Sequence, residues 1–351
     1  MSRLFLVFVF IFSPVFVLSF SGCAAGPAEQ RTEEWVSPID LKYKSKNPEL
    51  FAQYEEARKL LDNWRGQEEY LINANKILNS IIQSDDKYAP AHREFGRLYI
   101  MAGYINYDNF REGSLNPAET SILESIKIEP GYADAYVLLG HLYTNMKRYD
   151  EARIALAKAD YIGTKSPWLN LNWADLYNKL ENYDAAYTRY MKVVSEETSN
   201  RKAYSSALSG VTAYFRRMKE YDKANEWYKK QLEYEPESAW NWGNYASFLL
   251  YFREDVDGAI SNAEKALSIM NYGMGKFTLA CAIYTKWAKQ LESGNSDKAT
   301  QALFDKAYSI YPGIDEVIRE TSQYKGTKIT AEKLSEYIRN KGLTNTTTRN
   351  S

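Results

Sequence analysis

Few residue types in this chain could do covalent or acid–base chemistry. It contains two cysteines, Cys23 and Cys281, and two histidines, His92 and His141. The histidines have no HExxH spacing, and no pair of cysteines stands at the spacing of a zinc site. The two cysteines are 258 residues apart in sequence (281 − 23), so any role of theirs depends on where each one lies.

One stretch looks superficially like a phosphate-binding loop, NYGMGKFT at 271–278. Met270 stands where the first glycine of such a loop is required, and Phe277 replaces the serine or threonine after the lysine. The many carboxylates follow helical patterns and are typical of solvated helix faces. The sequence therefore predicts no enzyme, no metal site and no cofactor.

The first residues, MSRLFLVFVFIFSPVFVLSF, carry one positive side chain, Arg3, before an apolar run from Leu4 to Phe20. This order, followed by small residues, is typical of a secretory signal peptide, predicted here over residues 1–22. The run is shorter than the ~20 apolar residues that a membrane-spanning helix needs. A plain secreted protein and an uncleaved membrane anchor stay as alternatives to the lipid anchor described next.

The residues around the first cysteine, Ser21-Gly22-Cys23, resemble a bacterial lipobox, although Phe20 stands where that motif usually has leucine. The resemblance implies cleavage before Cys23 and lipidation of Cys23, and two or three acyl chains hold a protein stably at a bilayer. Ala24, in place of aspartate, favours the outer membrane. The expected location is the bacterial cell envelope, lipid-anchored, at the outer membrane and facing the periplasm.

The composition excludes some classes of partner. Lysine and arginine number 44 against 45 acidic residues, a formal net charge of −1, so there is no basic field for nucleic acid. Beyond Cys23 only Cys281 remains, so the predicted mature chain has no internal disulfide.

Three stretches repeat one pattern: MKRYDEARIALAKA (146–159), LENYDAAYTRYMKV (180–193) and MKEYDKANEWYKKQ (218–231). Their Tyr-Asp pairs begin at Tyr149, Tyr183 and Tyr221, with spacings of 34 and 38 residues. A period of this length indicates stacked supersecondary units that share one continuous core.

These stretches resemble the tetratricopeptide repeat (TPR), as do Leu139-Gly140 and Tyr143 upstream of the first pair. The resemblance implies an all-α fold, a right-handed superhelical solenoid of antiparallel helix hairpins. Small residues at fixed positions let the two helices of a hairpin approach, and Cys281, at one such position, is expected to be a buried, inert thiol. Six units are predicted over 89–312, starting near Ala89, Ala133, Pro167, Ser205, Ala239 and Met274, with a degenerate hairpin at 51–88 before them.

Three further segments flank or interrupt this array. Residues 23–50, with Pro38 and Pro48, are predicted to form a flexible tether. Residues 313–351 are predicted to hold a capping helix at 330–341 and a disordered tail. An insertion at 103–117 is either a partner-binding loop or an ordinary surface loop.

In the tetratricopeptide family the first helix of each hairpin lines a concave groove, which implies a set of partner-binding side chains. The groove candidates are Arg93, Arg97, His141, Asn145, Trp168, Asp175, Asn178, Lys179, Arg216, Arg217, Trp240 and Tyr251. Trp168 and Trp240 have the alternative role of packing on the preceding hairpin.

The sequence thus favours a lipid-anchored envelope scaffold that binds a protein or peptide in this groove. Such a scaffold would assist assembly of an envelope, pilus or secretion complex. The alternative is a glycan-handling lipoprotein of a polysaccharide export system, which a ladder of aromatic residues in the groove would favour. The expected partners are an envelope protein or peptide and the membrane, with no nucleic acid, and the chain is a possible homo-oligomer.

Overall fold

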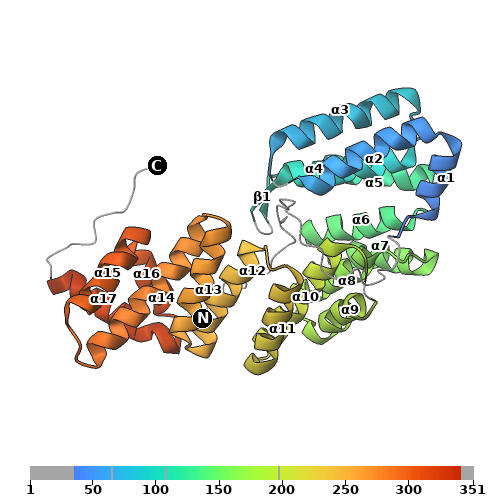
Figure 1. Ribbon diagram of the computed structural model, residues 1–351. Coiled ribbons are helices and arrows are strands. Elements are labelled where there is room, and N and C mark those ends of the chain that lie inside the picture. The colour runs from blue at the N-terminus through green and yellow to red at the C-terminus, as the bar shows by residue number, and fades with distance from the viewer. Residues whose placement is uncertain (1–34, 65, 107–108, 197, 341–351) are drawn as a thin grey trace. The chain divides into compact units, whose positions relative to one another are not determined.

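The computed structural model describes residues 35–64, 66–106, 109–196 and 198–340. These residues are mostly helical, and their β-structure is one two-stranded ribbon, β1 (Tyr104–Asn106) and β2 (Asn109–Phe110) (Figure 1). The chain divides into two compact units, which we call unit 1 (Met1–Met218) and unit 2 (Lys219–Ser351). The predicted signal peptide, Cys23 and the C-terminal tail lie outside the described residues.

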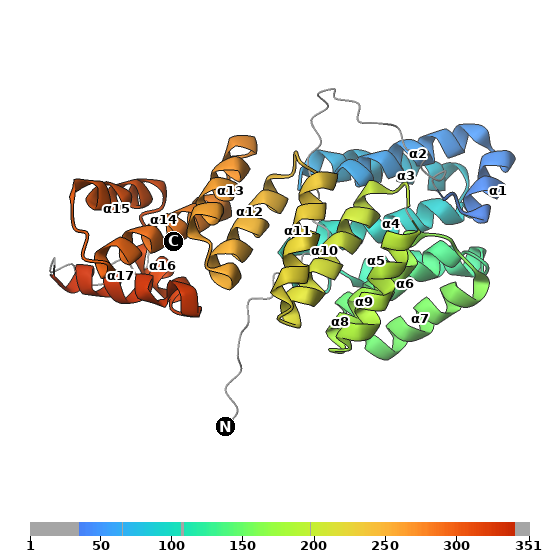
Figure 2. The ribbon, with the colours of Figure 1, turned by 60° about the horizontal axis from the view of Figure 1, so that its bottom comes forward.

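Unit 1 is a stack of helix hairpins. Its helices are α1 (Pro38–Lys46), α2 (Pro48–Asn63), α3 (Glu68–Ser84), α4 (Ala89–Gly103), α5 (Asn116–Ile128), α6 (Ala133–Asn145), α7 (Tyr149–Ile162), α8 (Pro167–Lys179), α9 (Tyr183–Ser195) and α10 (Arg201–Arg217). The first helix of each hairpin, from α4 onward, contacts both helices of the hairpin before it. Figure 2 shows these helices side by side, which confirms the predicted solenoid of hairpins.

Glycines set the separation of the helices in these hairpins. A Cβ atom added at Gly96 would lie 2.3 Å from Ile122, and one at Gly140 would lie 2.5 Å from Leu156. Contacts this short exclude any larger side chain unless its neighbour moves. The small-residue positions of the repeat are therefore a packing requirement of this chain.

The N-terminal boundary of the folded part differs from the prediction. Residues 38–46, expected in the flexible tether, form α1, and α2 begins at Pro48 rather than inside the predicted 51–88 hairpin. The two prolines suggested interruption, but each occupies the first turn of a helix, where its missing N–H costs nothing. The side chains of Ser37 and Asn47 cap these two helices by accepting a backbone N–H.

Unit 2 continues the hairpin pattern with irregular elements. It contains α11 (Tyr221–Tyr234), α12 (Ala239–Phe248), the π-helical turn η1 (Leu249–Arg253), α13 (Val256–Ile269), α14 (Gly273–Glu292), α15 (Lys298–Ile310), α16 (Ile314–Thr321), the 3₁₀ turn η2 (Lys325–Thr327) and α17 (Lys328–Asn340). The predicted fourth repeat is divided, because α10 belongs to unit 1 and α11 to unit 2.

The C-terminal region holds more structure than the single capping helix expected. Helices α16 and α17 and the turn η2 form a small subdomain that packs on α14. The buried Thr330 hydroxyl donates to the Thr285 hydroxyl at 2.9 Å, and the Tyr337 ring lies 4.3 Å from the ring of Phe304. Within the described ranges, no helix is long and apolar enough to cross a membrane.

Candidate functional site

Two predicted groove residues of α4 belong to a buried ion-pair network. Glu94, with a side chain only 1% exposed, accepts from Arg93 at 2.5 Å and from Arg97 at 3.3 Å. Arg93 also donates to the Tyr54 hydroxyl at 2.8 Å and lies against the Tyr132 ring. Both arginines therefore neutralise a buried carboxylate of their own helix.

This network extends from α4 to α2 and α10. Arg97 pairs with Asp62 at the end of α2 at 2.5 Å, and Lys202 of α10 donates to the Asp62 carbonyl oxygen. Burial raises the pKa of Asp62, but Arg97 and Lys202 outweigh it and hold that pKa below its usual value. Helices α2 and α10 are thus joined directly by two residues that lie 140 positions apart in sequence.

A second buried carboxylate fixes α1 to the same region. Asp40, 3% exposed, accepts from the Tyr132 hydroxyl at 2.5 Å and from the Tyr54 hydroxyl at 3.4 Å. Burial raises the pKa of Asp40, and the nearby charge of Arg93 opposes that rise. The predicted tether residues 38–46 are therefore part of the folded unit.

The groove candidates of α6 and α8 take different positions. Asn145 donates to the carbonyl oxygen of His141 at 3.0 Å and lies 3.1 Å from its Nε2 atom, so these two form one polar pair. Asn178 turns toward its own hairpin partner and donates to the Tyr190 hydroxyl at 2.9 Å. Trp168 packs against the apolar core, which is the packing alternative stated for it.

Asp175 and Lys179, also on α8, are half-buried. They remain candidates for partner binding, each with a polar or charged interaction of its own in unit 1.

The remaining candidates are engaged with aromatic rings or lie at a helix end. Arg217, at the end of α10, covers the Tyr183 ring at 4.0 Å, and its neighbour Arg216 is half-buried. In unit 2 the Trp240 ring lies 4.6 Å from that of Tyr272.

Tyr251 lies on η1 and is covered by the C-terminal subdomain of unit 2. Its ring stacks on Tyr324 at 4.4 Å, and burial raises the pKa of its hydroxyl well above the usual value. Cys281, beside Tyr251, is buried as expected, and burial raises the pKa of its thiol to about 12. The first-helix face of η1 and α14 therefore packs against this chain's own C-terminal segment.

The insertion of the first full repeat folds into the ribbon β1–β2. It replaces the tight turn that joins the helices of other hairpins, such as Met146 to Arg148 between α6 and α7. The Arg111 N–H donates to the Gly103 carbonyl oxygen at 2.9 Å, and the Tyr104 and Phe110 rings lie 5.8 Å apart across the ribbon. Residues 104–106 and 109–110 of the predicted loop are thus paired as two short strands.

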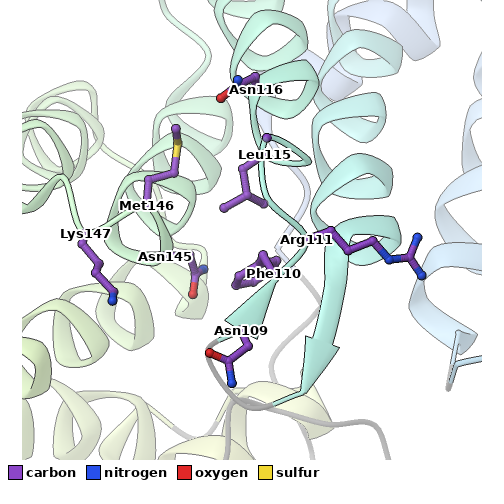
Figure 3. Close-up of a pocket in the computed structure, with 9 residues that line it drawn as sticks. Asn109, Phe110, Arg111, Leu115, Asn116, Asn145, Met146 and Lys147 are labelled. Carbon is purple, nitrogen blue, oxygen red and sulfur yellow. The ribbon is translucent and has the colours of Figure 1, made fainter.

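A shallow depression of about 340 Å³ lies between this ribbon and the α6–α7 turn (Figure 3). Its lining residues are Asn109, Phe110, Arg111, Gly113, Leu115, Asn116, Asn145, Met146 and Lys147. Three apolar side chains, Phe110, Leu115 and Met146, belong to or pack against the unit 1 core. Figure 3 shows the Phe110 ring directed toward Asn145, while Arg111 points away from the depression.

Only Asn145 of the predicted groove residues contributes to this depression. The sequence marked the 103–117 insertion as a possible binding loop, but gave no sign that Phe110 or Lys147 would meet across it. Among the residues that the structure describes, no group of histidine, cysteine, aspartate and glutamate side chains could hold a metal ion.

These features define a protein of stacked helix hairpins. Residues 133–162, which form α6, α7 and their turn, match the family model for the tetratricopeptide repeat. The fold is a tetratricopeptide-type α-solenoid. No curated protein sequence matches the chain.

Solved structures share this fold at low sequence identity. The Cut9–Hcn1 hetero-tetramer of APC/C matches with a TM-score of 0.53 and 16% identity, over 70% of this chain and 45% of that chain. The chain therefore spans less than half of that relative. PilF of Pseudomonas aeruginosa matches with a TM-score of 0.51 and 17% identity, over 68% of this chain and 98% of its own. PilW, a type IV pilus biogenesis factor, matches with a TM-score of 0.52 and 14% identity, over 65% of this chain and 97% of its own.

Proposed function

We propose that this chain is a lipid-anchored scaffold of the bacterial envelope, which binds a protein partner through unit 1 and assists assembly of a pilus or a related secretion complex. The observation that carries the binding role is the row of first helices α4, α6 and α8, with the ribbon β1–β2 beside them. A stack of hairpins of this kind is a rigid frame on which polar side chains hold fixed positions.

Two further observations support the envelope and pilus parts of the proposal. The Ser21-Gly22-Cys23 stretch resembles a lipobox, which would place acyl chains at Cys23. The fold resembles that of PilW, a type IV pilus biogenesis factor, over nearly all of that protein. Fold alone does not assign function, so this likeness selects the assembly to test first.

The glycan-handling alternative has less support. It called for a ladder of aromatic side chains in the groove. Trp168 packs against the core, Trp240 lies against Tyr272, and Tyr251 stacks on Tyr324. Rings already engaged in this way offer less face for stacking on a sugar.

Partner binding can be tested by crosslinking intact cells and recovering the tagged full chain from the envelope. We expect one or a few envelope proteins to be recovered with the wild type and to be reduced several-fold with Lys179→Glu on α8. The control, Lys192→Glu on α9, makes the same charge change at a more exposed site, where its partner Glu196 lies at 4.0 Å. Recovery of no protein above the background, or equal recovery with both variants, would contradict the proposed binding face.

The lipid anchor has a separate test. Mass spectrometry of the mature N-terminus is expected to show Cys23 as the first residue, carrying diacylglycerol and an acylated amine. A Cys23→Ala variant should keep its signal peptide and be absent from the lipid-modified fraction. An unmodified N-terminus beyond residue 23 would contradict the anchor, while leaving the scaffold proposal to the crosslinking test.

A further inference from the structure

The ribbon β1–β2 has one strand edge that faces a hollow. Tyr104 pairs with Phe110, and the Arg111 N–H donates to the Gly103 carbonyl oxygen. In an antiparallel pair, successive residues alternate between bonding to the partner strand and pointing away from it. The bond from Arg111 to Gly103 flanks the Tyr104–Phe110 pair, so the N–H and C=O of Phe110 point away from β1, although the register is irregular between Tyr104 and Asn106.

This free edge borders the depression. Figure 3 shows β2 on the side of the ribbon that faces Asn145, Met146 and Lys147. Three consecutive residues, Asn109 to Arg111, line the depression, as expected if β2 runs along its border. An unpaired strand edge is a template for an additional strand.

The lining of the depression has an apolar part, which we call the floor, and a polar part, which we call the rim. Phe110, Leu115 and Met146 supply the apolar surface, and the amide side chains of Asn109, Asn116 and Asn145 stand around it. An amide group can both donate to and accept from a peptide backbone. The volume, about 340 Å³, lies at the lower end of the ~300–1,000 Å³ range of ligand sites, enough for a few residues of an extended chain.

Lys147 brings a positive charge to the lining of the depression. Lys147, at the α6–α7 turn, makes no ion pair with any described residue. The acidic groups around this turn are already used, since Glu119 and Glu151 pair with Arg148, and Asp150 pairs with Arg153. Lys147 is therefore available to pair with an anionic group of a ligand.

We propose that this depression binds an extended peptide segment of a partner protein, which adds a strand to the free edge of β2. One aliphatic side chain of the segment rests on Phe110, Leu115 and Met146, and an acidic group lies beside Lys147. Main-chain bonds to β2 give affinity, whereas the apolar floor and Lys147 give sequence preference. This proposal rests on the proposed function in one respect, since both require a protein partner. It adds the place where the partner binds and the extended conformation of the bound segment.

The probe is selected without bias from phage-displayed random dodecapeptides on the purified full chain. We expect the enriched sequences to share an acidic residue near an aliphatic one, with no proline between them. The best peptide, synthesised with a fluorophore, gives the dissociation constant from fluorescence anisotropy.

The strand edge is tested by a matched pair of variants. Phe110→Ala removes the ring and keeps the N–H, whereas Phe110→Pro removes both, and proline is tolerated where an N–H faces outward from an edge strand. We expect Phe110→Pro to weaken binding at least tenfold more than Phe110→Ala. Circular dichroism of both variants, expected to match the wild type, shows that the hairpins stay folded.

Charge is tested in the same assay. Lys147→Glu should weaken binding at least tenfold, while Lys158→Glu, at an exposed lysine of α7 that does not line the depression, should change it less than threefold. No enriched peptide, or a peptide that binds Phe110→Pro and Lys147→Glu as tightly as the wild type, overturns the site. Such a result would leave the crosslinking test of the proposed function intact, because a partner could still bind α8.

Discussion

The buried ion network of α4 predicts a large loss of stability on a small chemical change, Glu94→Gln. The Glu94 side chain is 1% exposed and accepts from both Arg93 and Arg97. The substitution keeps the shape but removes the negative charge that neutralises two guanidinium groups. Arg93, itself only 12% exposed, would keep one carboxylate of the described residues within 4 Å, Asp134 at 3.9 Å.

The magnitude follows from the cost of a buried charge without its partner. Breaking a buried ion pair by removing one member costs about 3–5 kcal/mol. Because Asp62 still neutralises Arg97, we expect the lower part of this range, about 3 kcal/mol. For a unit of this size each kcal/mol lowers the melting temperature by about 2–4 °C, so the expected drop is about 6–12 °C.

The assay is thermal unfolding followed by circular dichroism, with Glu124→Gln as the control. Glu124 pairs with Lys127 at 2.9 Å on an exposed face of α5, where such a pair contributes about 0.5 kcal/mol or less. The control should therefore melt within about 2 °C of the wild type. Equal melting temperatures for the two variants would refute the view that Arg93 and Arg97 depend on Glu94.

Three further predictions test the packing and the chemistry of the fold. Gly140→Ala, whose added methyl group meets Leu156 at 2.5 Å, should destabilise unit 1 by about 1–3 kcal/mol in denaturant unfolding, while Gly131→Ala, with open space around it, should not. Glu181→Gly should stabilise by about 0.5–1 kcal/mol in the same assay, because Glu181 adopts φ 58°, a conformation that only glycine takes without strain, and an unchanged midpoint would count against this reasoning. Cys281 should resist iodoacetamide in the folded chain, since a thiol pKa of about 12 leaves about one molecule in ten thousand as thiolate at pH 8. The rate of alkylation, measured by mass spectrometry, should keep rising with pH. Rapid labelling at pH 8 without denaturant would refute the burial of this thiol.

Much of the solenoid could be predicted because its cause is local and periodic. The Tyr-Asp pairs at Tyr149, Tyr183 and Tyr221 each open a second helix, α7, α9 and α11. The small residues Gly96 and Gly140 mark where paired helices touch. Such positions repeat because each hairpin packs against its neighbours in the same way. The packing is therefore visible as a periodic pattern of residue types in the sequence.

The errors at the ends of the array also have local causes. In the sequence, Pro38 and Pro48 indicate breaks in a tether, whereas in the structure they begin α1 and α2. A proline excludes the middle of a helix and favours its first turn, so the residue alone does not distinguish a linker from a helix start. The caps at Ser37 and Asn47 were the signal that could have separated the two.

The candidate site was less predictable. A position on the first helix of a hairpin does not show whether the side chain is available to a partner or is already engaged within the chain. By itself, the sequence determined the helix periods, the hairpin stack and the set of side chains on each first helix. Only the tertiary structure decided that Arg97 is engaged by Asp62, that Tyr251 lies under Tyr324, and that Phe110 and Lys147 meet at one depression. The physical reason is that these contacts join segments whose separation in sequence does not follow the repeat. The repeat pattern therefore does not predict which residue each of these side chains contacts.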